Sequence, residues 1–281
     1  MTVRLVEDFK AGETAASRSA LLELVLSLKM YSRALVLVGG WVPYFLLRDH
    51  PRAGEPFFHV GSLDIDFVID PEQIGEDEYQ TIVSLIADVG WKGIPDKKFS
   101  FEREVVGPDQ VPYAIKVDFL TPELAGLGGK HRHRQLQPDL QARTMHGAEL
   151  ALAHRDTCHL EGTLPGGAET RADFLMLDVA GCLGTKGIAL GERFKHKDAY
   201  DIVSVLDNYG QGVKEAASFV RPFRTESLMS ESLGVLADKF RSERAEGPTW
   251  YAEFMGGDAD AKSRHAQRAY QLVNELGLLL S

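Results

Sequence analysis

The stretch Ser62-Leu63-Asp64-Ile65-Asp66-Phe67-Val68-Ile69 decides the fold class of this chain. Its first half alternates polar and apolar residues and its second half is wholly apolar, a pattern that predicts a central β-strand. Side chains alternate between the two faces of a strand, so Asp64 and Asp66 are expected on one face. A sheet with a carboxylate-bearing face is therefore expected in this part of the chain.

A second strand is predicted just upstream, over residues 34–38, where the chain is continuously apolar. Gly39-Gly40 ends this run, and the pattern of residues 41–49 then suits a short helix that begins at Pro43. The order strand, glycine turn, helix brings backbone N–H groups to a helix N-terminus, which favours a phosphate. A Gly-Gly pair is also a common plain turn, and only its combination with the acidic strand makes it informative.

A β-hairpin is expected downstream of the acidic strand. Strands are predicted over residues 98–106 and 111–120, and Gly107-Pro108-Asp109-Gln110 between them suits a tight turn. Asp118 lies near the end of the second strand among apolar residues, where an unpaired charge would be costly.

The remaining sequence suggests helices and one irregular segment. Helices are predicted over residues 14–32 and 77–90. The Gly-, His- and Arg-rich residues 121–170 contain one or two weaker strand candidates and are interpreted as irregular, a segment that could face a substrate. Further on, only helices are predicted; they cover residues 172–190, 197–209, 214–219, 227–241 and 259–279. We therefore expect an α+β fold, with a mixed β-sheet flanked by helices in residues 1–170 and an all-helical domain in residues 171–281.

The composition is that of a globular protein, and we expect it in the cytoplasm and not in a membrane. No run approaches the ~18 apolar residues of a membrane span, and Cys158 and Cys182 lack the spacing of a disulfide framework or zinc site. The formal net charge of −10 disfavours general affinity for nucleic acid. A nucleic-acid partner would need a local basic patch, for which the run Lys130-His131-Arg132-His133-Arg134 is a candidate; a solvated loop is the alternative interpretation.

Three aspartates suggest a divalent-metal site. Two carboxylates at positions i and i+2 of a strand can share ions, because hard cations such as Mg²⁺ or Mn²⁺ prefer oxygen ligands. Asp118 on a neighbouring strand would complete a set with Asp64 and Asp66. The alternative for Asp64 and Asp66 is an ordinary exposed strand face.

The glycine turn, the Asp-x-Asp strand and the Lys116-x-Asp118 strand, in this order, resemble the nucleotidyltransferase superfamily typified by DNA polymerase beta. Residues 185–202 sharpen the resemblance toward the AbiEii/AbiGii toxin-like nucleotidyltransferases, through Lys186, through Lys197 and through an aspartate that is either Asp198 or Asp201. The resemblance covers residues 34–206.

The chain departs from the family pattern at three points, of which Gly40 concerns the nucleotide contacts more than the metals. The chain has Gly40 where serine is frequent, a longer loop before Asp64, and Lys197 where arginine is common.

The resemblance implies a role for each matched residue. Lys186 would face the triphosphate, and the family spacing favours Asp201 over Asp198 as the functional aspartate. The catalytic residues would be Asp64, Asp66, Asp118, Lys186 and Asp201, with the first three as metal ligands. The nucleotide would be held by Gly39, Gly40, Lys116, Lys186, Lys197 and Asp198. Ser62, just before Asp64, is a further candidate for a phosphate contact, and the alternative is that it simply begins the strand.

The implied activity is transfer of a nucleoside monophosphate from an NTP to an acceptor, with Mg²⁺ or Mn²⁺ as cofactor. The resemblance further implies a toxin of a bacterial toxin–antitoxin system, with RNA such as transfer-RNA ends, or another cellular target, as acceptor, and a cognate antitoxin protein as partner. Two alternatives stay open: a small-molecule nucleotidyltransferase of the aminoglycoside-modifying kind, and a degenerate protein that binds nucleotide without catalysis.

Overall fold

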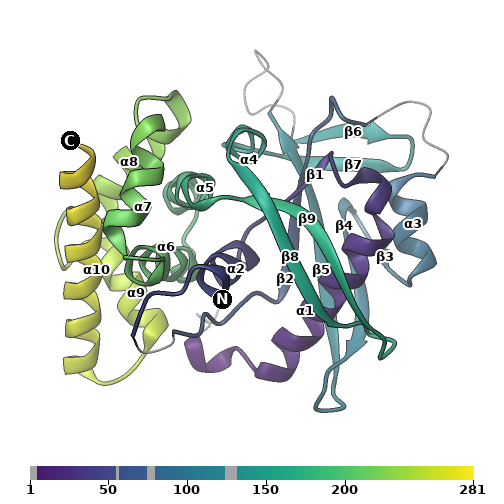
Figure 1. Cartoon of the computed structure of the whole chain (residues 1–281), viewed down its shortest axis with the longest axis horizontal. Coiled ribbons are helices and arrows are strands. Elements are labelled where there is room, and N and C mark those ends of the chain that lie inside the picture. The colour runs from purple at the N-terminus through teal and green to yellow at the C-terminus, as the bar shows by residue number, and fades with distance from the viewer. Residues whose placement is uncertain (1–4, 55–56, 75–79, 124–131) are drawn as a thin grey trace. The chain divides into compact units, whose positions relative to one another are not determined.

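The computed structural model describes residues 5–54, 57–74, 80–123 and 132–281, and the chain divides into two compact units (Figure 1). The sheet unit consists of Lys10–Trp41 and Gly61–Leu177. The helical unit consists of Met1–Phe9, Val42–Val60 and Asp178–Ser281. The sequence predicted a single boundary after residue 170, whereas each of these units is assembled from separate chain segments.

The sheet unit is built on one mixed sheet with strand order β3-β4-β5-β2-β1-β9-β8, and β7, which also pairs with β6, is hydrogen-bonded to β5. The β2–β5, β1–β9 and β5–β7 pairs are parallel and the other pairs are antiparallel. The expected α+β class with a mixed sheet is thus confirmed. The strands are β1 (Leu35–Val38), β2 (Asp64–Ile69), β3 (Lys92–Ile94), β4 (Lys97–Val106), β5 (Pro112–Pro122), β6 (His133–Gln137), β7 (Leu140–Met145), β8 (Arg155–Thr163) and β9 (Glu169–Leu177).

Helix α1 (Ala11–Ser27) covers one face of this sheet. It contacts β2, β4, β5, β8 and β9, so its leucines are buried on more than one side. Arg103 on β4 forms an ion pair with Glu23 on α1. Ser100 also lies on β4, three residues before Arg103. Because side chains alternate along a strand, Ser100 points to the face of the sheet opposite α1. The unit also contains α3 (Ile82–Asp88) and α4 (Glu149–Ala153).

The helical unit packs its helices around a shared apolar core. Helix α5 contacts α6, α7 and α8, and α10 contacts α6, α7, α8 and α9. In the described residues, no helix is both long and apolar enough to cross a membrane. Besides α2 (Trp41–Asp49), the helices are α5 (Val179–Glu192), α6 (His196–Asn208), α7 (Val213–Val220), α8 (Ser227–Lys239), α9 (Glu246–Met255) and α10 (Ala259–Leu280).

Two sequence predictions are wrong. Residues 121–170 hold more regular structure than the one or two weaker strands expected, because their described part contains β6, β7, α4, β8 and the start of β9. The helix predicted from Ala172 begins only at Val179, since residues up to Leu177 form β9 and the Asp178 side chain caps α5 by accepting a hydrogen bond from the N–H of Gly181 at 2.8 Å. Strand pairing with β8 overrides the apolar spacing that suggested a helix.

The predicted helix over residues 77–90 is shorter than expected. Helix α3 begins at Ile82, and the Thr81 hydroxyl accepts a hydrogen bond from the N–H of Ser84. The first part of the predicted range, residues 77–79, lies outside the described residues.

Candidate functional site

The carboxylates of the predicted metal site lie on adjacent strands of the sheet unit. Strands β2 and β5 are parallel neighbours in which Asp66 pairs with Asp118 and Asp64 pairs with Lys116. Paired residues share a face, so all three aspartates lie on the face opposite α1. Strand spacings of about 4.8 Å across and 3.3 Å along the sheet keep their Cα atoms within roughly 8 Å. We call Asp64, Asp66 and Asp118 the carboxylate row.

The glycine turn touches this row directly. Gly39 follows β1, whose last residue, Val38, pairs with Asp66. Gly39 has a φ of +78°, and a Cβ atom added to it would lie 2.3 Å from Oδ2 of Asp66. Glycine is therefore required at position 39 both by backbone conformation and by the approach of the carboxylate. The adjacent Gly40 is buried and precedes helix α2.

Asp118 is held by a serine that the sequence analysis missed. Ser100 on β4 pairs with Asp118 across the strands, is buried, and donates a hydrogen bond from Oγ to Oδ1 of Asp118 at 2.5 Å. Burial raises the pKa of Asp118, and the negative charge of Asp64 adds to that rise. The Ser100 hydrogen bond and the charges of Arg143 and Lys97 oppose it. Carboxylates this close together repel one another, and a cation bound between them would offset that repulsion.

The donor set of the carboxylate row fits Mg²⁺ or Mn²⁺, because three carboxylates supply hard oxygen ligands on one face. In the described residues, no three His, Cys, Asp or Glu side chains converge as metal ligands. Oδ1 of Asp118 accepts a hydrogen bond from Ser100 on one side of the carboxylate row. On the other side of the row, Oδ2 of Asp66 lies close to Gly39. Sharing one ion would require these side chains to turn toward one another.

The other predicted nucleotide contacts of the sheet unit flank the row. Lys116 is exposed and lies between Asp64 and Glu102 in the strand register. Ser62 precedes β2 and is buried. Of the predicted basic run, Lys130 and His131 lie outside the described residues, whereas His133 begins β6.

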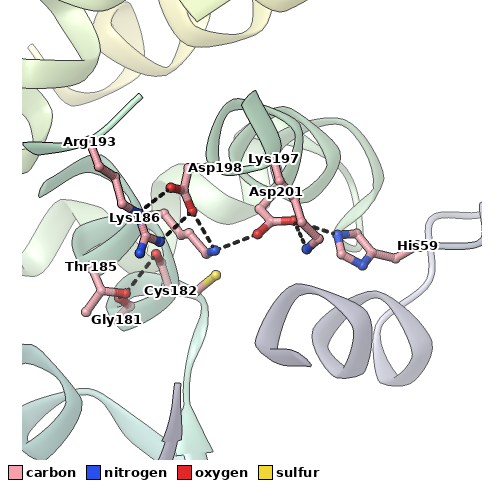
Figure 2. Close-up of polar contacts among 9 residues, drawn as sticks. All are labelled: His59, Gly181, Cys182, Thr185, Lys186, Arg193, Lys197, Asp198 and Asp201. Atoms are coloured by element: carbon pink, nitrogen blue, oxygen red, sulfur yellow. Dashed lines mark hydrogen bonds and ion pairs between the residues drawn. The ribbon is translucent and has the colours of Figure 1, made fainter. Parts of the chain in front are cut away.

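The predicted residues of the helical unit form a buried ion network (Figure 2). Lys186 on α5 places Nζ 3.0 Å from Oδ1 of Asp198 and 2.5 Å from Oδ2 of Asp201, both on α6. Lys197 donates to Oδ1 of Asp201 at 2.8 Å, and Arg193 contacts both oxygens of Asp198. The helical spacing of Asp198 and Asp201 brings both carboxylates to the same ammonium group. We call Lys186, Lys197, Asp198 and Asp201 the buried ion network.

The charges of this network stabilise one another. Burial alone would raise the pKa of Asp198, but the positive charges of Lys186 and Arg193 outweigh it and lower that pKa to about 2. Burial acts likewise on Asp201, and Lys186 and Lys197 hold its pKa well below the usual range. Burial would lower the pKa of Lys186, yet Asp201 and Asp198 raise it. Burial lowers the pKa of Lys197, although the charge of Asp201 opposes the shift. Lys186, Asp198 and Asp201 are therefore stabilised in their charged forms although they are buried.

His59 is a further member of this cluster that the sequence analysis missed. Its Nε2 lies 3.1 Å from Oδ1 of Asp201, and its ring packs on the ring of Tyr200 with centroids 4.9 Å apart (Figure 2 shows the Asp201 contact). Burial lowers the pKa of His59 to about 4, although the hydrogen bond to Asp201 opposes the shift. Because Asp201 is ionised, Nε2 carries the hydrogen and donates it. A separation of 142 residues gave the sequence no signal for this pair.

Comparisons with known proteins add little. No family model matches the chain, and no curated protein matches it. Among solved structures, the crystal structure of JHP933 from Helicobacter pylori matches 96% of this chain and 94% of that chain with 11% identity and a TM-score of 0.41.

Proposed function

We propose that this protein is a metal-dependent nucleotidyltransferase that moves a nucleoside monophosphate from an NTP to an acceptor. The observation that carries the proposal is the register of β2 and β5, which sets Asp66 beside Asp118 with Asp64 two residues along the same face. A structural role alone gives little reason to collect three acids on one sheet face, since like charges repel.

The residues around the row support the same chemistry. Asp64, Asp66 and Asp118 would hold a divalent cation, which when bound would offset the charge of a triphosphate and activate an attacking oxygen. Gly39 leaves room for Asp66, and the glycine turn before α2 offers backbone N–H groups to a phosphate. Ser100 fixes one oxygen of Asp118. Lys186 lies in the helical unit, where Asp198 and Asp201 pair with its ammonium group, so its contact with phosphate stays an expectation from the resemblance.

The biological role stays a prediction from the sequence resemblance. A toxin of a toxin–antitoxin system, a cognate antitoxin and an RNA acceptor such as transfer-RNA ends are expectations that no comparison tests.

The substitution Asp66→Asn tests the proposal. Purified protein is incubated with each α-labelled NTP, Mg²⁺ and either total RNA or a metabolite extract, and label transfer is followed. The variant should lose transfer and, without metal, should be as stable as the wild type or slightly more stable, because one repelling charge is gone. With Mg²⁺ and NTP, thermal melts should show a larger stabilisation for the wild type, which alone gains full binding energy.

Asp173→Asn is the matched control, because Asp173 is an exposed strand aspartate on β9 of the same unit. It should keep both transfer and ligand-induced stabilisation. Transfer by Asp66→Asn at the wild-type rate, or equal stabilisation of the two proteins by Mg²⁺ and NTP, would contradict the assignment.

A further inference from the structure

Arg155 lies on the same face of the sheet as the carboxylate row and at the same level across the strands. On β8 it pairs with Leu177 of β9. The β1–β9 register, continued by one residue, sets Val38 beside Leu177, and Val38 pairs with Asp66 of β2. Paired residues share a face, so the side chains of Arg155 and Asp66 leave the sheet on the same side, with Cα atoms roughly 14 Å apart by standard strand spacing.

These residues lie at one edge of the sheet, where three strands begin or end. Arg155 is the first residue of β8, Leu177 is the last of β9 and Val38 is the last of β1. Gly39 follows Val38 and lies close to the Asp66 carboxylate. In the order of the strands, the glycine turn after β1 therefore comes between Arg155 and Asp66, and all of these residues belong to the sheet unit.

The guanidinium group of Arg155 has a buried donor that the protein leaves unused. Nη1 of Arg155 is shielded from solvent, and within the described residues it has no hydrogen-bond partner. The residue opposite it on β9 is the apolar Leu177, whereas Arg171, further back on β9, pairs with Glu161. A buried charged donor without an acceptor costs free energy, so an anion that accepts a hydrogen bond from Arg155 would remove that cost.

We propose that Arg155 binds the terminal phosphates of the NTP and thereby selects a triphosphate over a monophosphate. This inference rests on the proposed function and adds a substrate contact that lies outside the sequence motifs. The carboxylate row repels phosphate, so the phosphates beyond it need a cation of their own, and a guanidinium group can donate two hydrogen bonds to one phosphate. Lys116 suits this task less, because Asp64 and Glu102 flank it on the neighbouring strands.

Binding to the full chain is measured by titration calorimetry in the presence of Mg²⁺. The probes are α,β-methylene ATP, which cannot transfer its nucleotide, inorganic tripolyphosphate, and AMP. Arg155→Met keeps the apolar stem and removes the guanidinium group. It should weaken binding of the two triphosphate probes about tenfold, because charge-assisted hydrogen bonds are lost, and should leave AMP binding within about twofold of the wild type. Arg155→Lys keeps the charge without the paired donors and should recover part of the loss.

Stability without ligand distinguishes a substrate contact from a structural one. If Arg155 waits for an anion, Arg155→Met should unfold in urea at the same concentration as the wild type or at a higher one, because a buried unpaired donor is gone. A clear loss of stability in this variant would show that the guanidinium group serves the fold, and would overturn the inference.

Arg171→Met is the matched control, because Arg171 is an exposed arginine on the same sheet face, six residues before Leu177 and so about 20 Å along β9. It should bind all the probes as the wild type does. If Arg155→Met kept the wild-type preference for α,β-methylene ATP over AMP, this inference alone would be wrong. If the wild type itself showed no such preference, the proposed function would fail together with it.

Discussion

At the scale of single residues, His59 makes the free energy of unfolding of the helical unit depend on pH. The pKa of its imidazole is lowered from 6.5 to about 4, because burial disfavours the charged form. Between these values the unfolded chain binds more protons than the folded protein. The free energy of unfolding therefore falls as pH is lowered from 6.5 to 4. The depressed pKa of Asp198 acts at lower pH, where stability is lost between about pH 4 and 2.

The substitution His59→Gln should remove this dependence. A glutamine amide can still donate to Asp201 but does not titrate, so the variant should gain about 2 kcal/mol relative to the wild type between pH 7 and pH 5. Urea unfolding at several pH values measures the difference. His159→Gln is the control, because His159 is exposed on β8. Parallel pH profiles of the wild type and His59→Gln would show that His59 protonates in the folded protein as readily as in the unfolded chain.

The candidate site could be predicted from the sequence only where periodicity fixes a face. The two-residue period of β2 correctly placed Asp64 and Asp66 on one face, and Asp118, singled out by its apolar neighbours, pairs with Asp66 in the strand register. Ser100 and Arg143 join them through strand register, which depends on loop lengths and not on local pattern. The expected partnership of Lys186 with a triphosphate remains a prediction, because the structure shows its ammonium between two aspartates.

At the scale of elements, the β4–β5 hairpin shows how one residue decides such a register. The sequence predicted a turn over residues 107–110, which would pair Val106 with Val111. In the structure Val106 pairs with Pro112, and the N–H of Gly107 donates to the carbonyl of Val111. The shift by one residue places Ser100 opposite Asp118, where the predicted turn would have placed Phe99. Composition thus predicts that a hairpin exists but not which face each residue takes.

Gln110 closes this turn with a φ of +62°, which a side chain makes costly. A left-handed conformation costs about 1–2 kcal/mol for a residue with a Cβ atom, and the added freedom of glycine in the unfolded chain costs about 0.4–1 kcal/mol. Gln110→Gly should therefore stabilise the protein by about 0.5–1 kcal/mol, measured by urea unfolding. Gln110→Ala keeps the Cβ atom and should bring no such gain. Equal free energies of unfolding for the two variants would mean that position 110 carries no strain.

Strands β8 and β9 were not individually predicted from the sequence, and the physical reason differs from that of the hairpin register. Strands β8 and β9 pair with each other along their whole length. Their short apolar alternation is interrupted by charged side chains on exposed positions, so neither reads clearly as a strand until its partner is known. Helices with long apolar stripes, such as α10, need no partner to be recognised, and the prediction for this helix ended within one residue of the observed end.

At the scale of the whole molecule, the division into units does not follow the order of the chain. The helical unit includes Val42–Val60, which precedes most of the sheet. Within this segment, Phe45 of α2 is fully buried, Pro51 forms a β-bridge with Tyr209, and His59 contacts Asp201. The helices after residue 178 therefore complete their core with a segment that lies far upstream in the sequence.

A fragment cut at the boundary expected from the sequence should consequently fold poorly. Residues 171–281 alone would leave Asp201 without His59 and expose apolar surface that α2 covers, and each such loss is a large part of a small domain's stability. Thermal unfolding of this fragment, followed by circular dichroism, should show a broad transition at low temperature. Adding a synthetic peptide of residues 41–60 should restore a sharper, later transition that depends on peptide concentration, and a peptide with His59→Ala should restore it less. If the fragment alone unfolds cooperatively and the peptide changes nothing, then α2 and His59 are peripheral to the core of the helical unit, and the simple cut after residue 170 describes this protein better than the two units do.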